Sequence, residues 1–312
     1  MAGPRGLPPV TAQEFRALYD RVRRHSPGGR AGRGALDLIT PDRVVAAARE
    51  VRTGRQVSLA APVETHPGPD SAEPAEHRMT GPVAGRIDSR GEQYTWDHFR
   101  MNIHGDVDSH LDALCHVIYD GTLHGGVDAA RVTPAGAEEL SVEVARDGIV
   151  GRGVLLDIPR LRGVAWLEPG DQVTGEELAA AEAAQGIRVG AGDLLFVRVG
   201  HRRRRGELGP WESGASRAGL HPAAVEFLAE RQVTVLGSDA DSDVAPSVAE
   251  GVATPVHVLA VHAMGVHMLD YLQFEDLVPV CEELRRWSFL CVVAPLRLPG
   301  ATGSPVNPVA VF

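Results

Sequence analysis

The sequence contains few cysteines, few aromatic residues and no long apolar run, and each scarcity argues against a class of protein. Cys115, Cys281 and Cys291 are odd in number and form no CxxC pair, so the 312 residues indicate neither a disulfide framework nor a cysteine-zinc site. Aromatic residues make up only 5% of the chain, beside 35 Gly and 22 Pro, which indicates a loop-rich fold packed with Ala, Val and Leu. Without about 18 consecutive apolar residues or a signal-peptide core, we expect a cytoplasmic protein that does not cross a membrane.

Positive charge is also scarce. The net charge of −10 argues against broad nucleic-acid binding, which requires phosphate neutralisation. The one basic run, residues 201–205, is short and is more typical of a solvated loop than of an anion site. The sequence contains no P-loop, and no GxGxxG fingerprint occurs at a strand-to-helix junction, so nothing indicates ATP or NAD dependence. We therefore expect a small-molecule substrate.

Helical spacing dominates the first part of the chain. Apolar residues recur at helical intervals over residues 11–25, and Thr40 followed by Pro41 begins a second expected helix that extends to residue 51. Residues 52–92 are rich in Pro, Gly and charge and are expected to form strands and long loops. The predicted organisation is a helical extension over residues 1–60 and a main domain over residues 61–312.

From residue 151 onward the pattern alternates between strands and helices. Strands are expected at 153–158, 193–199, 233–237 and 289–296, and helices at 178–185, 221–231 and 274–287. A capping box, Thr174 to Glu177, precedes the first of these helices, and Gly186 ends it. The run 256–261 fits a helix or a strand. These elements predict an α/β fold with a mixed sheet and flanking helices.

The greatest concentration of reactive side chains lies in residues 101–116, MNIHGDVDSHLDALCH, with a strand expected to lead into it over 94–103. In an extended segment, His110 and Asp112 point to the same side and can meet one cation. Asp106 and Asp108 share that side if the segment remains extended. A helix beginning at Asp112 would bring His116 over the same site through its i, i+4 spacing.

Imidazole and carboxylate ligands together suit Zn²⁺, Mn²⁺ or Fe²⁺. Such a cation lowers the pKa of bound water towards about 7 and polarises a carbonyl, while a nearby histidine outside the ligand set moves protons. The alternative is a cluster of polar residues that are merely surface-exposed or hydrogen-bonded to one another. The density of His and Asp favours the metal site.

A second cluster lies about 150 residues downstream, where His257, His262, His267 and Asp270 occur within an apolar segment. Isolated histidines in such segments are usually hydrogen-bonded core residues. Because three histidines lie close to an acid here, a contribution to the metal site is as reasonable as a role in the core. His257 and Asp270 flank an apolar segment and can face one pocket.

The segment SHLDALCHV, residues 109–117, resembles the longer form of the HxGTHxDxPxH motif of the cyclase family of metal-dependent hydrolases. This group includes bacterial kynurenine formamidases, isatin hydrolases and proteins described as polyketide cyclases. Further similar stretches are RGVLLD at 152–157, GIRVGAGDLLFVR at 186–198, and Pro255 to His257 followed by Gly265 and Asp270. The resemblance covers roughly residues 75–290.

The resemblance implies a swivelling β/α/β fold, usually assembled as a homo-oligomer, which we expect to be a homodimer or homotetramer. It implies that His110, Asp112, His257 and Asp270 bind a divalent metal and that His116 is the catalytic histidine. Where the family has its first histidine, this chain has Asp106. If Asp106 is a ligand, its carboxylate would favour Mn²⁺ over Zn²⁺. Alternatively, a local bulge allows His104 to bind the metal, or one of two metal positions is lost.

Two enzymatic functions and one non-catalytic function fit this pattern. The first is a hydrolase that opens a C–N amide or lactam bond with metal-activated water and His116. The second is a cyclase or dehydratase that acts on a natural-product intermediate, with the same metal as Lewis acid and His116 as base. The third is a binding protein that retains the fold and holds no transition metal. We favour the hydrolase.

Overall fold

The computed structural model describes residues 7–26 and 32–312, and its centre is a nine-stranded mixed sheet. The strand order is β1-β17-β15-β9-β11-β13-β14-β4-β16. The bounds are β1 Gln56–Ser58, β4 His110–Asp112, β9 Ile149–Asp157, β11 Leu194–Arg198, β13 Val235–Ser238, β14 His267–Asp270, β15 Ser288–Val293, β16 Gly303–Pro305 and β17 Val309–Val311. The predicted α/β class with a mixed sheet is confirmed.

The middle of the sheet is parallel: β9, β11, β13 and β14 run in the same direction. Their residues are almost entirely buried, as expected for parallel strands covered on both faces. Antiparallel strands complete both sides, with β15 beside β9 and β4 beside β14. The sheet therefore presents its parallel centre to the core and places the short strand β4 next to β14.

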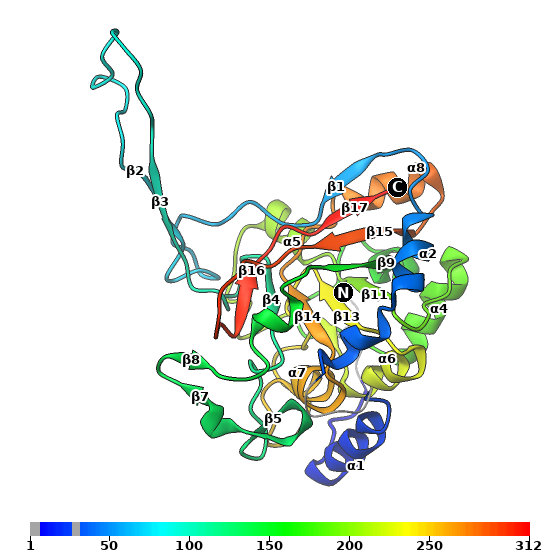
Figure 1. Cartoon of the computed structure of the whole chain (residues 1–312). Helices are drawn as coiled ribbons and strands as arrows, with labels where there is room; N and C mark the ends of the chain where they lie inside the picture. The colour runs from blue at the N-terminus through cyan, green and yellow to red at the C-terminus, as the bar shows by residue number, and fades with distance from the viewer. Residues whose placement is uncertain (1–6, 27–31) are drawn as a thin grey trace.

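The sheet is flanked by helices (Figure 1), whose bounds are α1 Ala12–Arg23, α2 Pro41–Ala48, α3 Ile158–Arg162, α4 Gly175–Gln185, α5 His201–Leu208, α6 Val225–Arg231, α7 Pro255–His257 and α8 Leu277–Leu284. Thr11, Thr40 and Thr174 cap α1, α2 and α4 through their side chains. Both Thr11 and Thr174 form complete capping boxes, so the predicted start of α4 is confirmed. The basic run 201–205 lies in α5, not in a loop, so that expectation was wrong.

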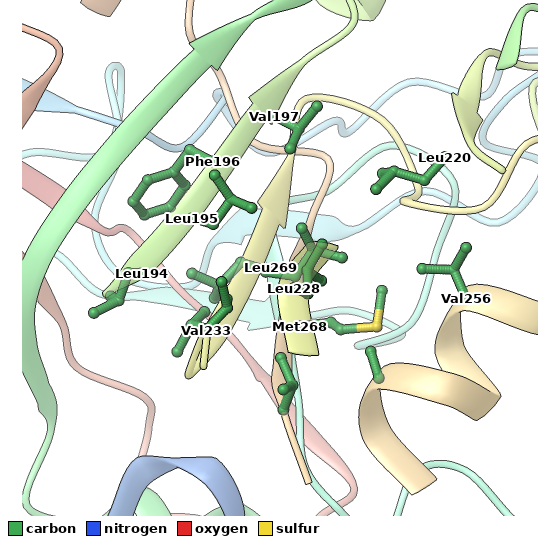
Figure 2. Close-up of a cluster of buried hydrophobic side chains, with 14 of the residues drawn as sticks. Leu194, Leu195, Phe196, Val197, Leu220, Leu228, Val233, Val256, Met268 and Leu269 are labelled. Carbon is green, nitrogen blue, oxygen red and sulfur yellow. The ribbon is translucent and has the colours of Figure 1, made fainter. Parts of the chain in front are cut away.

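The core fills the space between the sheet and its helices. Figure 2 shows Leu195, Val197, Leu228 and Met268 among the clustered side chains, and none of these four is exposed by more than 1%. Burying an aliphatic side chain of this size contributes roughly 1.5–3 kcal/mol. This packing fixes the positions of β14 and α7, which carry residues of the site below, and of β13, which directly precedes others.

Shorter elements connect the sheet to its surroundings. Two-stranded pairs are formed by β2 Glu76–Met79 with β3 Asp97–Arg100, β5 Thr122–Leu123 with β6 Val127–Asp128, β7 Val132–Thr133 with β8 Gly136–Ala137, and β10 Gln172–Val173 with β12 Gly219–Leu220. The 3-10 helices are η1 Gly34–Leu38, η2 His124–Gly126, η3 Ala129–Arg131, η4 Val142–Ala145 and η5 Pro222–Ala224. The ambiguous run 256–261 forms α7 and the π-helix η6, Val258–Met264.

The first sixty residues are joined to the rest of the structure by contacts. Tyr19 of α1 places its hydroxyl 2.8 Å from His262 Nδ1 in η6, and β1 pairs with β17 of the main sheet. Residues 1–6 and 27–31 of the expected extension lie outside the described residues. The boundary at residue 60 stays a prediction. Within the described residues, no helix combines the length and apolar character that a membrane span requires.

Candidate metal centre

The register between β4 and β14 builds one wall of the candidate site. These antiparallel strands pair Asp270 with His110 and Met268 with Asp112. Residues directly opposite each other in an antiparallel pair point to the same face of a sheet. His110, Asp112 and Asp270 therefore project together, although 158 positions separate Asp112 from Asp270 in the sequence.

Asp112 is the centre of the site. Its side chain is only 1% exposed, yet neither carboxylate oxygen has a partner in hydrogen-bond geometry among the described residues. Oδ1 lies 2.8 Å from His104 Nδ1 and 3.6 Å from His110 Nε2, and Oδ2 lies 3.3 Å from His257 Nε2. Leaving a buried charged group unsatisfied is costly. Ring nitrogens and carboxylate oxygens aimed at one another without hydrogen-bond geometry suit a shared cation.

Two three-residue groups meet at Asp112. His104, His110 and Asp112 form the first, Asp112, His257 and Asp270 form the second, and the ligand atoms of each group lie within 4.8 Å of one another. Both donor sets combine nitrogen and oxygen, as Zn²⁺ and Mn²⁺ accept. The residues present therefore fit a divalent metal. The two groups contain four of the expected ligands, His110, Asp112, His257 and Asp270, together with His104, and the role of each as a ligand stays a prediction.

His104 reaches Asp112 because a glycine provides space. A Cβ atom on Gly303 would lie 2.8 Å from His104 Cε1, so the imidazole occupies the space that a side chain would fill. The other ring nitrogen, Nε2, lies 2.9 Å from Thr302 Oγ1. This contact leaves Nδ1 directed at Asp112. The chain bends at residues 103–104, which is the local irregularity that would let His104 reach the site.

His257 lies in the short helix α7 and is oriented by hydrogen bonds to the carboxylate of Asp243. Asp243 is fully buried and accepts hydrogen bonds from His257 Nδ1 at 2.6 Å, from the backbone N–H of Val256 at 2.7 Å and from that of His257 at 3.1 Å. A proton on Nδ1 leaves the Nε2 lone pair free for a metal. Asp243 therefore fixes the tautomer that ligation needs.

Asp241 lies at the edge of the same site. Asp241 accepts a hydrogen bond from Arg217 at 2.7 Å, and its Oδ1 lies 3.9 Å from His257 Nδ1. Sequence reasoning missed Asp241 and Asp243. The signal was the run SDADSD at 238–243, which follows the carboxyl end of the parallel strand β13, where α/β folds place their ligands.

The charges of the site depend on one another. Burial opposes the charged form of His257, but neighbouring carboxylates, Asp241 foremost, outweigh it and raise the pKa of this imidazole well above its usual value. Burial likewise opposes ionisation of Asp112, yet the adjacent rings of His104 and His257 hold the pKa of its carboxyl well below the usual range. Without a metal, these shifts favour a protonated His257 beside an ionised Asp112, and a divalent cation would take the place of the proton on His257 Nε2.

His116 lies beside the two groups and is not a member of either. Its ring stacks on His104 with centroids 3.8 Å apart, and its Nε2 lies 4.0 Å from Asp112 Oδ2. Burial lowers the pKa of His116 to about 4, so the ring is neutral near pH 7 and can accept a proton. The expected helix after Asp112 is absent: a turn, with the His116 N–H donating to the carbonyl of Ala113, brings His116 back instead.

The two remaining acids of the motif point elsewhere, because residues 106–108 are bent rather than extended. Asp106 is exposed at the rim, accepts a hydrogen bond from the Tyr271 hydroxyl at 3.1 Å, and belongs to none of the groups found among the described residues. Asp108 is buried and accepts from the backbone N–H of Glu64 at 2.8 Å. The segment does not remain extended, so Asp106 and Asp108 do not lie on the side of His110.

Two histidines of the downstream cluster have structural positions. His262 lies near Tyr19 and Thr122, and His267 is fully buried, with neither ring nitrogen hydrogen-bonded within the part of the chain that the structure describes. Neither residue belongs to a ligand group among the described positions. Of the four candidates in that cluster, His257 and Asp270 are the ones that the fold brings to Asp112.

A cavity of about 360 Å³ opens onto the candidate ligands, which is room for a small molecule. Its other walls come from Val117 and Ile118 after the motif, from Thr254 and Val258 around α7, and from Tyr271. Tyr271 has a positive φ of 54°, a conformation uncommon for a bulky side chain. The cavity combines buried ligands with a neutral histidine and an open side for a substrate.

The fold and the site together define an α/β protein with a candidate metal centre of histidines and aspartates. A family model described as "Putative cyclase" matches residues 43–242, which is more than half of the chain. The chain belongs to this cyclase family. The family resemblance of the motif segment is thereby confirmed.

Solved structures agree with this assignment. A crystal structure of a novel cyclase is 30% identical, with a TM-score of 0.78 over 90% of this chain and 94% of the other. Isatin hydrolase A from Ralstonia solanacearum is 25% identical, with a TM-score of 0.59 over 88% and 98%. A predicted metal-dependent hydrolase from Bacillus stearothermophilus is 18% identical, with a TM-score of 0.52 over 82% and 97%, and shows the shared fold. The search of curated proteins found no match.

Proposed function

We propose that this protein is a metal-dependent hydrolase that cleaves a C–N amide or lactam bond of a small molecule. The observation that carries the proposal is Asp112, a buried carboxylate with two unpaired oxygens facing histidines on both sides. The similarity to an isatin hydrolase supports a cyclic or acyclic amide as the scissile group.

The proposed ligands are His104, His110, Asp112, His257 and Asp270. A divalent metal, Mn²⁺ or Zn²⁺, would supply a water nucleophile at neutral pH and stabilise the developing oxyanion. Asp106 remains the alternative ligand that the sequence favours, and His104 is the choice that the 2.8 Å approach to Asp112 supports.

His116 is proposed to carry the proton. Its neutral ring accepts a proton from the attacking water and delivers it to the leaving nitrogen, because it lies at the cavity wall with its side chain 30% exposed. His104 stacks against it and limits its rotation. Val117, Ile118 and Val258 provide the apolar wall against which the substrate rests.

The test is turnover of a panel of N-formyl amines and lactams in ¹⁸O-labelled water. The proposal predicts one labelled oxygen in the carboxylate product, and a loss of at least about a hundredfold in kcat for His116→Ala with metal content unchanged. His66→Ala is the matched control, since the side chain of His66 is 87% exposed and far from the ligands in the sequence. Ring closure or dehydration without labelled oxygen would point to the cyclase alternative and refute hydrolysis.

A further inference from the structure

One acidic side chain in the wall of the cavity belongs to neither of the two ligand groups. Asp106 lines the cavity and is exposed at its rim. Its Oδ1 accepts a hydrogen bond from the Tyr271 hydroxyl at 3.1 Å. Its other oxygen, Oδ2, accepts no hydrogen bond from any residue that the structure describes. The carboxylate of Asp106 therefore has one acceptor oxygen left for a bound molecule.

The turn that follows α5 fixes the position of Asp106. The buried Ser213 hydroxyl donates to the backbone carbonyl of Asp106 over a long contact of 3.4 Å. The next residue, Gly214, leaves the space that the carboxylate occupies, because a Cβ atom on Gly214 would lie 2.7 Å from Asp106 Oδ2. A side chain at residue 214 would therefore displace the carboxylate from the rim.

Tyr271 holds the other oxygen of the carboxylate. Its side chain is 1% exposed, and its ring packs beside those of His201 and His110, with centroids 5.6 and 6.3 Å away. A bulky residue with a φ of 54° is strained, and such residues persist where the surrounding packing enforces them, commonly at functional sites. The hydroxyl gives its single hydrogen to Asp106 and keeps its lone pairs for a donor in the cavity.

The charge of Asp106 has no counterpart in the cavity wall. The described residues that line the cavity include four aspartates and four histidines but neither arginine nor lysine. Arg217 lies behind the wall, where its guanidinium donates to Asp241 at 2.7 Å and to three backbone carbonyls. A divalent metal would balance the charges of Asp112 and Asp270. Asp106 is then the acid whose charge stays unbalanced beside the substrate.

We propose that Asp106 selects substrates that carry a protonated amino group, which it binds through Oδ2 together with the hydroxyl oxygen of Tyr271. The inference rests on the proposed function and narrows the substrate class to amides or lactams with a cationic amine. An ammonium group has three N–H donors and no acceptor, so it suits two neighbouring acceptor oxygens. A carboxylate on the substrate would meet Asp106 with like charge and is selected against.

The bound amine would lie close to the reacting bond. Tyr271 directly follows the proposed ligand Asp270, and Asp106 is two residues beyond His104. These short connections tie both acceptor groups to the candidate metal centre. An amine held by them would fix the orientation of the amide carbonyl, which is the usual contribution of a substrate-positioning contact.

The test compares three formamides of similar size with the metal-loaded full chain at pH 7. N-formylethylenediamine is cationic, N-formylethanolamine is neutral and N-formyl-β-alanine is anionic. We expect kcat/KM for the cationic compound to exceed that for the neutral one at least about tenfold, and the anionic compound to be the poorest. In Asp106→Asn the ratio of cationic to neutral should fall to within about twofold of one, because the ammonium then meets a neutral amide.

Matched variants separate recognition by Asp106 from a purely structural role. Asp147→Asn is the control, because Asp147 is 84% exposed and lies outside the cavity lining, and its ratio should equal that of wild type. Gly214→Ala keeps the charge but displaces the carboxylate, so it should lower the ratio as well. Tyr271→Phe removes only the second acceptor and should lower it less. A structural role would reduce kcat/KM for all three compounds alike, and an unchanged ratio in Asp106→Asn would overturn the proposal.

A binding measurement separates a failure of this inference from a failure of the proposed function. Calorimetric titration of the His116→Ala chain gives dissociation constants for the same compounds without turnover. Tighter binding of the cationic compound, lost when Asp106→Asn is added, would support the role of Asp106 even if wild type hydrolyses none of them, in which case the hydrolase proposal alone fails. Equal or undetectable binding of the cationic and neutral compounds would overturn the inference even if wild type hydrolyses both.

Discussion

Replacing Asp243 by Asn tests how His257 is prepared for a metal. One oxygen of the Asp243 carboxylate lies 2.7 Å from the Val256 N–H, and the other lies 2.6 Å from His257 Nδ1. An asparagine has a single acceptor oxygen. If this oxygen serves the Val256 N–H, the amide NH₂ faces Nδ1, so Nδ1 must become the acceptor and the proton must move to Nε2.

A proton on His257 Nε2 blocks the lone pair that faces Asp112 and Asp270 at 3.3 and 3.2 Å. Loss of an orienting group of this kind typically weakens metal affinity by about 10–100-fold, which corresponds to roughly 1.4–2.7 kcal/mol. We therefore expect Asp243→Asn to bind Zn²⁺ or Mn²⁺ about 10–100-fold more weakly while remaining folded. Asp270 and Asp112 would still be present, so binding should weaken and not vanish.

The assay is competition for the metal against a chromogenic chelator, with thermal melting in parallel. Asp147→Asn is the control, because the side chain of Asp147 is 84% exposed, and its affinity should equal that of wild type. An affinity of folded Asp243→Asn within about twofold of wild type would refute the argument, since the tautomer of His257 would then not depend on Asp243.

The other predictions concern the ligand set, metal removal and acid stability. His104→Ala should lower the amount of metal bound, whereas Asp106→Asn should leave it unchanged; the reverse result in elemental analysis would assign the ligand role to Asp106. Chelation should abolish turnover and lower the melting temperature, because the buried carboxylate of Asp112 would lose its partner, and re-addition of Mn²⁺ or Zn²⁺ should restore both. Burial lowers the pKa of His267 to about 3, so the unfolded chain, with a pKa near 6.5, binds the proton first and stability falls as pH drops from about 6.5 towards 3. His267→Leu should flatten this decline, by an upper bound of about 3 kcal/mol, in urea unfolding between pH 7 and 4; an identical slope in both proteins would contradict the assignment.

The sequence alone predicted the local geometry of residues that lie close together in the chain. His110 and Asp112 are two residues apart in a strand, and a period of two places them on one side whatever the rest of the fold does. Helix beginnings were equally local, since the capping box at Thr174 needs only four consecutive residues. The α/β class followed from buried apolar strands alternating with helices.

Sequence patterns did not predict the register between distant strands or the bends within loops. The pairing of Asp270 with His110 is set by packing of β14 against β13 and β4, which no short pattern encodes. Bends at residues 106–108 turn Asp106 and Asp108 away from the side of His110, and the space above Gly303 admits His104 instead. Periodicity arguments assume a regular segment, so they fail where a loop brings a side chain to the candidate site.

The role of Asp243 could not be predicted from the sequence for a different reason. Its role depends on a hydrogen bond to a histidine 14 residues later, formed because α7 lies beside the loop that follows β13. The run SDADSD signals that something is bound or capped there, but not which acid faces His257. Only the arrangement of the elements distinguishes Asp243, which orients His257, from Asp241 two residues earlier.

Elemental analysis of the purified protein tests the central claim most directly. The account predicts at least about one equivalent of Mn²⁺ or Zn²⁺ per wild-type chain, and its loss in a folded Asp112→Asn variant, because Asp112 is shared by both ligand groups. Wild-type protein that binds no divalent transition metal even when the metal is supplied in excess, or Asp112→Asn protein that binds as much as wild type, would contradict it.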